Sequence, residues 1–143
     1  MRTQEVAVYR EIQRNTEMAM KAMDTISDKV YDDQLAMQIS RQTLKYSELH
    51  NEAMKQLISA KAEPYRSSYM FDMLVKAGIH YNTLLNTSTG HIAELMIKGS
   101  NMGVLEMEKI LNRNEGAGEK SKGLAKQLLD FEAKNIERLK KYL

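Results

Sequence analysis

The first 77 residues contain no glycine, and Pro64 is the single proline in the chain of 143 residues. Glycine and proline punctuate a chain, and a protein built from short strands needs such a turn signal roughly every 8 to 12 residues. Apolar residues instead recur three or four positions apart, which is the spacing of one face of a helix. The sequence therefore excludes sandwiches and barrels and predicts an all-α protein.

Two long helices are predicted in this first part of the chain. One apolar series ends at Val30 and a second begins at Leu35, with Asp32 and Asp33 between them. Aspartate accepts hydrogen bonds from the free N–H groups of a helix start, so the aspartates indicate a tight corner. We expect two antiparallel helices of about 27 residues, each roughly 40 Å long at 1.5 Å per residue.

A long connection separates this hairpin from a second one. The only proline lies within residues 59–66 and is expected to end the second helix there. Residues 67–86 are predicted to form a connecting helix, and Ser88 to cap a helix that runs to Arg113. Residues 114–118 form a loop that contains two glycines. The last helix follows, with an inner face made of Leu124, Leu128, Phe131, Asn135, Leu139 and Tyr142.

The length of the connection predicts the topology. A crossover of about 25 residues makes the second and third helices parallel, as in ferritin-like folds, whereas an up-down-up-down bundle needs a short link there. We expect one domain over residues 1–143, a ferritin-like four-helix bundle with a helical crossover between its second and third helices.

The helix lengths, the position of the crossover and the segment HIAELMIKGSNMGVLEMEKIL (91–111) resemble the small ferritin-like bundles of spore-forming bacteria, such as the spore-coat F-like proteins. Metal-binding members of the superfamily carry a glutamate on each of two helices and a Glu-x-x-His pair on each of the others. The resemblance implies iron binding and oxygen chemistry where that motif is present. It is absent here. The residues three positions before His50, His80 and His91 are Ser47, Ala77 and Ser88.

An atypical metal site is the alternative that the remaining acidic residues and histidines leave open. A two-metal centre needs several carboxylates that converge with imidazole nitrogens. The best candidate ligands are Glu17, Glu48, His50, Glu52, His91 and Glu94. The competing interpretation is that His50 forms a hydrogen bond at a helix interface and that Glu94 pairs with Lys98 one turn away. We favour this second interpretation and expect no metal and no cofactor.

Three polar residues, Thr16, Gln42 and Asn135, fall on the inner faces of the predicted helices. We expect them to form one buried hydrogen-bonded layer that fixes the register of the helices. The alternative is a polar pocket for a small ligand. A carrier of a lipid or small molecule is a related hypothesis, for which a continuous apolar cavity would be the signature.

Glycine and methionine mark two further features. Gly99 and Gly103 lie four positions apart, and such a strip lets another helix approach closely. We expect this packing within the chain, with packing between subunits as the alternative.

The chain has 11 methionines, among them Met18, Met20 and Met23. Flexible methionine side chains fill irregular gaps in a core, and an adaptable surface for a partner is the alternative.

An apolar rim is the predicted contact with a protein partner. Tyr65, Tyr69 and Phe71 lie near the crossover and add apolar area where a bundle leaves an edge.

The 21 basic and 19 acidic residues leave a net charge of +2. A nucleic-acid-binding protein concentrates basic residues on one face, and no such surplus occurs here.

The remaining exclusions concern location and chemistry. The chain has no cysteine, so disulfides and thiolate metal sites are ruled out. It has no apolar stretch of the length of a signal peptide or membrane span, so we expect a cytoplasmic protein without a leader. Catalytic sequence motifs such as a phosphate-binding glycine loop or a Gly-x-Ser-x-Gly elbow are absent.

The sequence thus predicts a non-enzymatic helical bundle that acts through protein contacts. Such a protein works as a homodimer or in a structural role like that of a spore-coat component. An atypical ferritin-like metal-binding or oxidative protein is the alternative.

Overall fold

The computed structural model describes residues 3–66, 73, 75–80 and 86–143. Its helices are α1 (Thr3–Ser27), α2 (Asp33–Ser59), α4 (Thr89–Arg113) and α5 (Glu119–Leu139), followed by a short 3-10 helix, η1 (Lys140–Tyr142). Residues 75–80 are helical as well, and none of the described residues forms a strand. The prediction of an all-α protein is confirmed.

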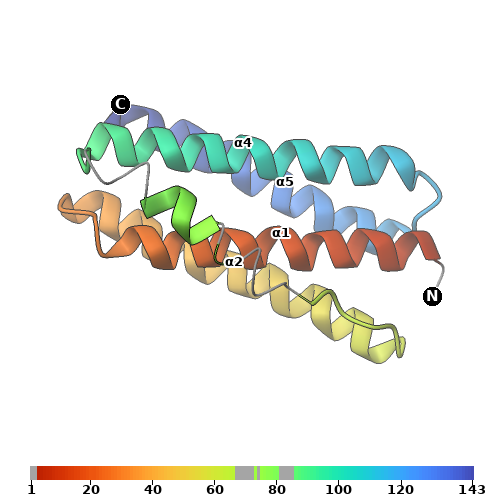
Figure 1. Ribbon diagram of the computed structural model, residues 1–143. Helices are drawn as coiled ribbons and strands as arrows, with labels where there is room; N and C mark the ends of the chain where they lie inside the picture. Colours follow the sequence, from red (N-terminus) through yellow and green to blue (C-terminus); the bar gives the residue numbers. More distant parts are fainter. Residues whose placement is uncertain (1–2, 67–72, 74, 81–85) are drawn as a thin grey trace.

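The four long helices lie side by side along one direction (Figure 1). α1 runs antiparallel to α2, and α4 runs antiparallel to α5, so the chain forms two hairpins. α2 and α4 point the same way, as a long connection between them requires (Figure 1). Of the predicted connecting helix, the structure describes only residues 73, 75–80 and 86, and the remainder of 67–86 lies outside the described residues.

The helix starts follow the predicted caps. The side chain of Asp32 accepts a hydrogen bond of 2.9 Å from the backbone N–H of Leu35, where α2 begins. Ser88 accepts one of 3.3 Å from the backbone N–H of His91 at the start of α4. Both predicted helix starts are therefore confirmed, because a side-chain oxygen replaces the missing helical acceptor at each start.

The end of α2 has a different cause from the expected one. The helix ends at Ser59, five positions before Pro64, in a turn that two backbone hydrogen bonds close, Lys61 N–H to Ile58 O and Ala62 N–H to Leu57 O. Lys61 has a φ of 56°, the left-handed conformation that this turn requires. The proline lies in the segment beyond, so the backbone turn ends the helix.

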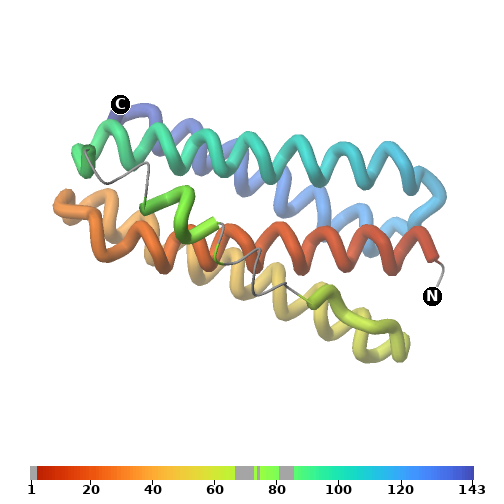
Figure 2. Tube along the Cα trace, in the orientation of Figure 1, coloured from red at the N-terminus to blue at the C-terminus, as the bar shows by residue number. Residues whose placement is uncertain are grey.

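After α2 the chain turns back, as the tube in Figure 2 shows. Two side chains of α1 hold this returning segment by its backbone. Arg10 donates to the carbonyl of Glu63 at 2.6 Å. The amide of Gln13 both donates to the carbonyl of Tyr65 (3.1 Å) and accepts from its N–H (2.9 Å). Residues 60–66 are thereby fixed against α1.

α1 contacts each of the other three long helices, α2, α4 and α5. Its buried residues occupy more than one face, and they include Val8, Ile12, Asn15, Thr16 and Ile26. The predicted apolar faces of α2 and α4 are buried at Leu35, Tyr46, Leu49, Ile92 and Met96 among others. No helix among the described residues is long and apolar enough to cross a membrane.

A pocket with a buried carboxylate

Four polar side chains meet in the interior between the two hairpins. Tyr46 of α2 donates from its hydroxyl to Oε1 of Glu132 on α5 at 2.5 Å. Asn135 Nδ2, one turn further along α5, donates to the same oxygen at 2.9 Å, and Ser100 of α4 donates at 3.4 Å. Glu132 is only 2% exposed. One carboxylate oxygen thus accepts hydrogen bonds from three helices.

Burial dominates the electrostatics of Glu132. It raises the pKa of the Glu132 carboxyl above its ordinary value, while the hydrogen bonds from Tyr46, Asn135 and Ser100 lower that pKa. Among the described residues, none of the ion pairs includes Glu132. The carboxylate is therefore held by neutral donors, and no cation among the described residues offsets its charge.

Tyr46 is fixed by packing as well as by its hydroxyl. Its ring meets Phe131 of α5 edge to face, with 5.3 Å between the ring centroids. Burial, the neighbouring charge of Glu132 and the hydrogen bond to it hold the pKa of Tyr46 well above its usual range. The tyrosine hydroxyl consequently keeps its proton and acts as a donor to the carboxylate.

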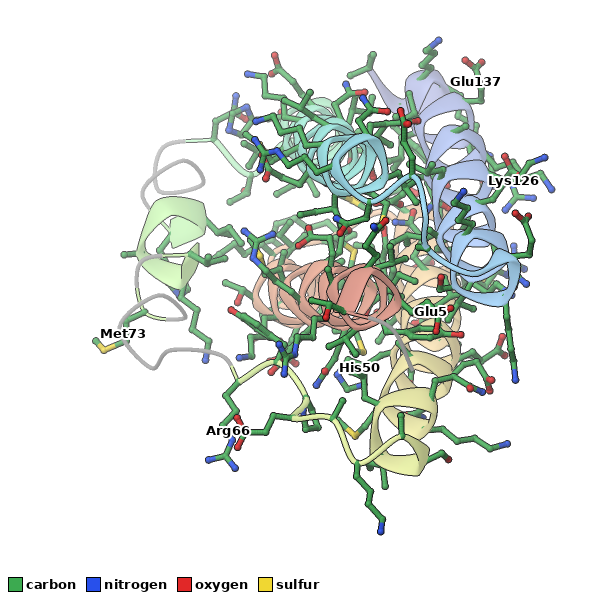
Figure 3. All side chains as sticks on the ribbon, turned by 90° about the vertical axis from the view of Figure 1, so that its right-hand side faces the viewer. Glu5, His50, Arg66, Met73, Lys126 and Glu137 are labelled. Carbon is green, nitrogen blue, oxygen red and sulfur yellow. The ribbon has the colours of Figure 1, made fainter. Side chains whose placement is uncertain are left out.

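A pocket of about 570 Å³ opens onto this cluster, since Tyr46, Ser100 and Glu132 line it. Its walls come from α1, α4 and the helical residues 75–80. In the view along the helices, residues 75–80 lie on the side of α1 and α4 that faces away from α5 (Figure 3). The walls are mostly apolar and include Met18, Ala22, Met23, Ile79, Leu95 and Met96. This combination is typical of a ligand site, where a few polar groups fix the orientation of an apolar molecule.

The remaining polar lining comes from Arg14, Asn15 and Glu106. Arg14 is already engaged, because its Nη1 lies 2.9 Å from Oε1 of Glu11. Burial raises the pKa of Glu11, and the charge of Arg14 acts in the opposite direction. Glu106 lies 3.3 Å from Lys109 in an exposed ion pair. The charged groups of this end of the pocket are thus paired among themselves.

Gly103 brings two oxygen atoms to the pocket surface. The Asn15 amide donates from Nδ2 to the carbonyl of Gly103 at 2.8 Å, which orients its other atom, Oδ1. A Cβ atom at position 103 would lie 2.9 Å from Asn15 Oδ1 and 3.4 Å from Glu132 Oε2. Because Gly103 has no side chain, both oxygens pack close to its Cα, and all three residues line the pocket.

The three predicted inner polar residues are all buried, but they do not form one layer. Thr16 donates to the carbonyls of Ile12 and Gln13 in its own helix. Gln42 accepts from Gln38 on α2, and Asn135 joins the cluster around Glu132. Among the described residues, no hydrogen bond joins the three to one another, and buried Gln42 Nε2 and Asn135 Oδ1 lack a partner. The predicted single layer is wrong, because the threonine hydroxyl finds its acceptors within one helix.

The candidate metal ligands lie in separate places. His50 Nε2 and Glu17 Oε2 are 4.0 Å apart between α2 and α1, and Figure 3 shows His50 at that contact. His91 and Glu94 approach to 3.7 Å on α4. Glu48 pairs with Lys45 at 3.5 Å and Glu52 accepts from Gln56. Within the described ranges, no three histidine or acidic side chains gather in a group that would hold a metal ion.

Glu94 lies 3.5 Å from Lys98, as the competing interpretation expected. The glycine prediction is only half right, since Gly103 meets the Asn15 side chain closely while nothing lies within 4 Å of a Cβ built on Gly99. Gly99 lines the pocket and does not form a helix contact among the described residues.

The methionine and rim predictions concern the same region. Met23 is buried, and both Met18 and Met23 line the pocket. Tyr69 and Phe71 of the predicted rim lie outside the described residues, and Tyr65 is held by Gln13.

The chain was compared with protein-family models, curated proteins and solved structures. None of them matches it. The site is therefore interpreted from its own geometry.

Glu132 is the residue that sequence reasoning missed, because the predicted inner face of this helix passed through Phe131 instead. A signal for it exists in the sequence. Ala125, Leu128, Glu132, Asn135 and Leu139 are spaced by alternating steps of three and four, and all five are buried. A carboxylate inside such a series needs hydrogen-bond donors in the core, and Tyr46 occupies the matching apolar face of α2.

Proposed function

We propose that this protein binds a small, mostly apolar molecule in the pocket between α1, α4 and residues 75–80. The observation that supports the proposal is an apolar pocket of about 570 Å³ whose deep end is polar and includes buried Glu132. Pockets for small ligands typically measure roughly 300 to 1,000 Å³ and combine apolar walls with a few convergent polar groups. A ligand carrier is one of the hypotheses that the sequence left open.

A dye-binding titration tests this function. Nile red, an uncharged apolar dye, should bind saturably with one molecule per chain and gain fluorescence as it leaves water. Two substitutions should fill the pocket from opposite walls, Gly99→Leu on α4 and Ala22→Phe on α1, because both positions line it. Each is expected to weaken binding by about tenfold or more, which corresponds to about 1.4 kcal/mol.

The matched control is Gly123→Leu on α5. Gly123 resembles Gly99 in that a Cβ atom built on either glycine has none of the described atoms within 4 Å. Unlike Gly99, Gly123 does not line this pocket. Dye binding should stay unchanged in this variant. The proposal fails if the wild-type protein shows no saturable binding, or if all three variants bind the dye as well as the wild type does.

A second copy of the chain is a further candidate partner, and the exposed face of α2 favours it. Met37, Leu44 and Ile58 are 56%, 67% and 60% exposed, and they lie on a seven-residue spacing that Asn51 completes. The spacing places the three apolar side chains on one exposed stripe of α2, which can form a seam with the same stripe of a second copy. The prediction of action through protein contacts is therefore retained as a proposal for α2.

Light scattering after size exclusion distinguishes the outcomes. The wild-type chain should be a dimer at about 50 μM, and Leu44→Glu should make it monomeric, because a charge in a seam is costly to bury. Leu105→Glu on α4, another exposed leucine, serves as the control and should leave the dimer intact. A wild-type monomer at that concentration would contradict the proposal.

For the fold we propose a ferritin-like four-helix bundle with a helical crossover. The support is the parallel direction of α2 and α4 together with the helical residues 75–80 in the connection (Figure 1). A structural role like that of the spore-coat proteins and a cytoplasmic location stay predictions from the sequence.

A further inference from the structure

The chemistry of the ligand's polar end follows from the deep end of the pocket. We propose that the pocket holds a single-chain aliphatic primary amine, whose ammonium group lies between Glu132 Oε2 and Asn15 Oδ1. This inference rests on the proposed function, because it names the class of molecule that the same pocket binds.

The two carboxylate oxygens of Glu132 have different surroundings. Oε1 accepts the hydrogen bonds of Tyr46, Asn135 and Ser100. Oε2 accepts none of the hydrogen bonds formed among the described residues, and it lies close to Gly103, which lines the pocket as Glu132 does. An ionised carboxylate can accept about four hydrogen bonds, so Oε2 is an open acceptor in a residue that is 2% exposed.

Asn15 Oδ1 is the second open acceptor at the same place. Its amide nitrogen is used by the carbonyl of Gly103, which leaves Oδ1 as the atom that faces the pocket. Both oxygens lie within 3.4 Å of the position that a Cβ of residue 103 would take, so they are near each other beside the Cα of that glycine. A pocket ligand that reaches both acceptors at once needs at least two N–H donors, and a primary ammonium has three.

Charge also favours a cation. The pocket is lined by one basic residue, Arg14, and two acidic residues, Glu106 and Glu132. Arg14 is paired with Glu11 and Glu106 with Lys109, which leaves Glu132 as the group whose charge is uncompensated among the described residues. A ligand carboxylate would place a second negative charge beside Glu132, whereas an ammonium would neutralise it.

The other end of the pocket suits an aliphatic chain. From Asn15 the α1 wall continues through Met18, Ala22 and Met23 to Ile26, over roughly 16 Å at 1.5 Å per residue. Leu95 and Met96 line it from α4. The methionine side chains are flexible and can adapt to a chain without a fixed shape. An elongated apolar channel of about 570 Å³ accommodates one chain rather than the two chains of a membrane phospholipid.

Competition with bound Nile red tests the head group. Dodecylamine, dodecanol, dodecanoic acid and dodecyltrimethylammonium share one chain and differ in charge and in N–H donors. Dodecylamine should displace the dye at a concentration about tenfold lower than each of the other three. Dodecyltrimethylammonium distinguishes the effect of charge from the effect of hydrogen bonding, because it carries a positive charge but has no N–H group. Equal displacement by all four, or tightest binding of the acid, would overturn the inference while leaving the pocket itself established.

Two variants assign the effect to the proposed atoms. Glu132→Gln should abolish the preference for the amine and leave binding of dodecanol within about twofold of the wild type. Gly103→Ala places a methyl group between the two oxygens and should weaken amine binding by about tenfold, and the Asn15 side chain can shift to accommodate it. Glu94→Gln, an exposed glutamate on α4, is the matched control and should retain the full preference.

Each result has a defined meaning even if one variant folds poorly. Loss of the amine preference in Gly103→Ala supports the inference without recourse to Glu132→Gln. An unchanged preference in either folded variant contradicts it. Failure of the wild-type protein to bind Nile red would instead reject the proposed function, which is thus distinguished from failure of the head-group inference.

Discussion

The hydroxyl oxygen of Tyr46 lies 2.5 Å from Oε1 of Glu132, although the two residues are 86 positions apart in the chain. The contact joins α2 in the first hairpin to α5 in the second. It also explains how a glutamate is accommodated in the interior, because a hydrogen bond to a charged group is worth more than one between neutral groups.

The first prediction concerns this hydrogen bond. Tyr46→Phe removes the hydroxyl, keeps the ring against Phe131 and leaves Glu132 with two donors. We expect a loss of about 1.5 to 3 kcal/mol in the free energy of unfolding, measured in urea by circular dichroism. The exposed tyrosine Tyr31 provides the control, since Tyr31→Phe should change stability by less than about 0.5 kcal/mol. Equal effects of the two substitutions would contradict the assigned role.

The second prediction concerns pH. The pKa of Glu132 is raised on folding, so the folded state binds its proton more tightly than the unfolded state does. The contribution of Glu132 to stability therefore falls as pH rises from below the ordinary carboxyl pKa to above the raised value. Glu132→Gln keeps an oxygen acceptor and cannot ionise. Relative to wild type, its unfolding free energy should increase as pH rises from below the ordinary carboxyl pKa through the raised value.

Urea unfolding at several pH values measures this difference. The control Glu94→Gln removes a half-exposed carboxylate, and it should change the unfolding free energy by less than about 1 kcal/mol, as expected of an exposed ion pair. A constant difference between Glu132→Gln and wild type at all pH values would show that the carboxyl does not titrate in this window.

The third prediction concerns the segment held by Gln13. Gln13→Met keeps the length of the buried side chain but removes both hydrogen bonds to the backbone of Tyr65. We expect a loss of about 1 to 3 kcal/mol, because a donor and an acceptor lose their partners. Hydrogen exchange of the Tyr65 amide should become faster, while Gln34→Met at an exposed position of α2 should not affect it. Unaltered protection of that amide would contradict the assigned contact.

The fourth prediction concerns the left-handed residue after α2. Lys61 has a φ of 56°, a conformation that glycine adopts without a steric cost. Lys61→Gly should raise the unfolding free energy by about 0.5 to 1 kcal/mol. The same substitution at exposed Lys55 inside α2 should lower it by about 1 kcal/mol. Opposite signs for two Lys→Gly variants are the expected result of thermal or urea unfolding, and equal signs would refute the assignment.

The helices could be predicted from sequence because their signals are local. Asp32 and Ser88 form side-chain caps within three residues of their own positions, and the apolar spacing needs only one helix at a time. The site was less predictable, because it depends on which helices meet. The spacing within α5 indicates that Glu132 is buried, but two of its hydrogen-bond donors, Tyr46 and Ser100, are distant in the chain. The end of α2 was placed correctly but for another reason, since a backbone turn needs no signature residue.

The separation of Tyr46 from Glu132 along the chain also bears on the order of folding events. We expect each hairpin to form first from contacts between helices that are neighbours in the chain, and the carboxylate to acquire its tyrosine donor when the two hairpins dock. Before docking, water solvates Glu132 at no cost. Replacing Tyr46 should consequently leave the rate of folding nearly unchanged and speed unfolding, as expected of a contact that is absent from the transition state.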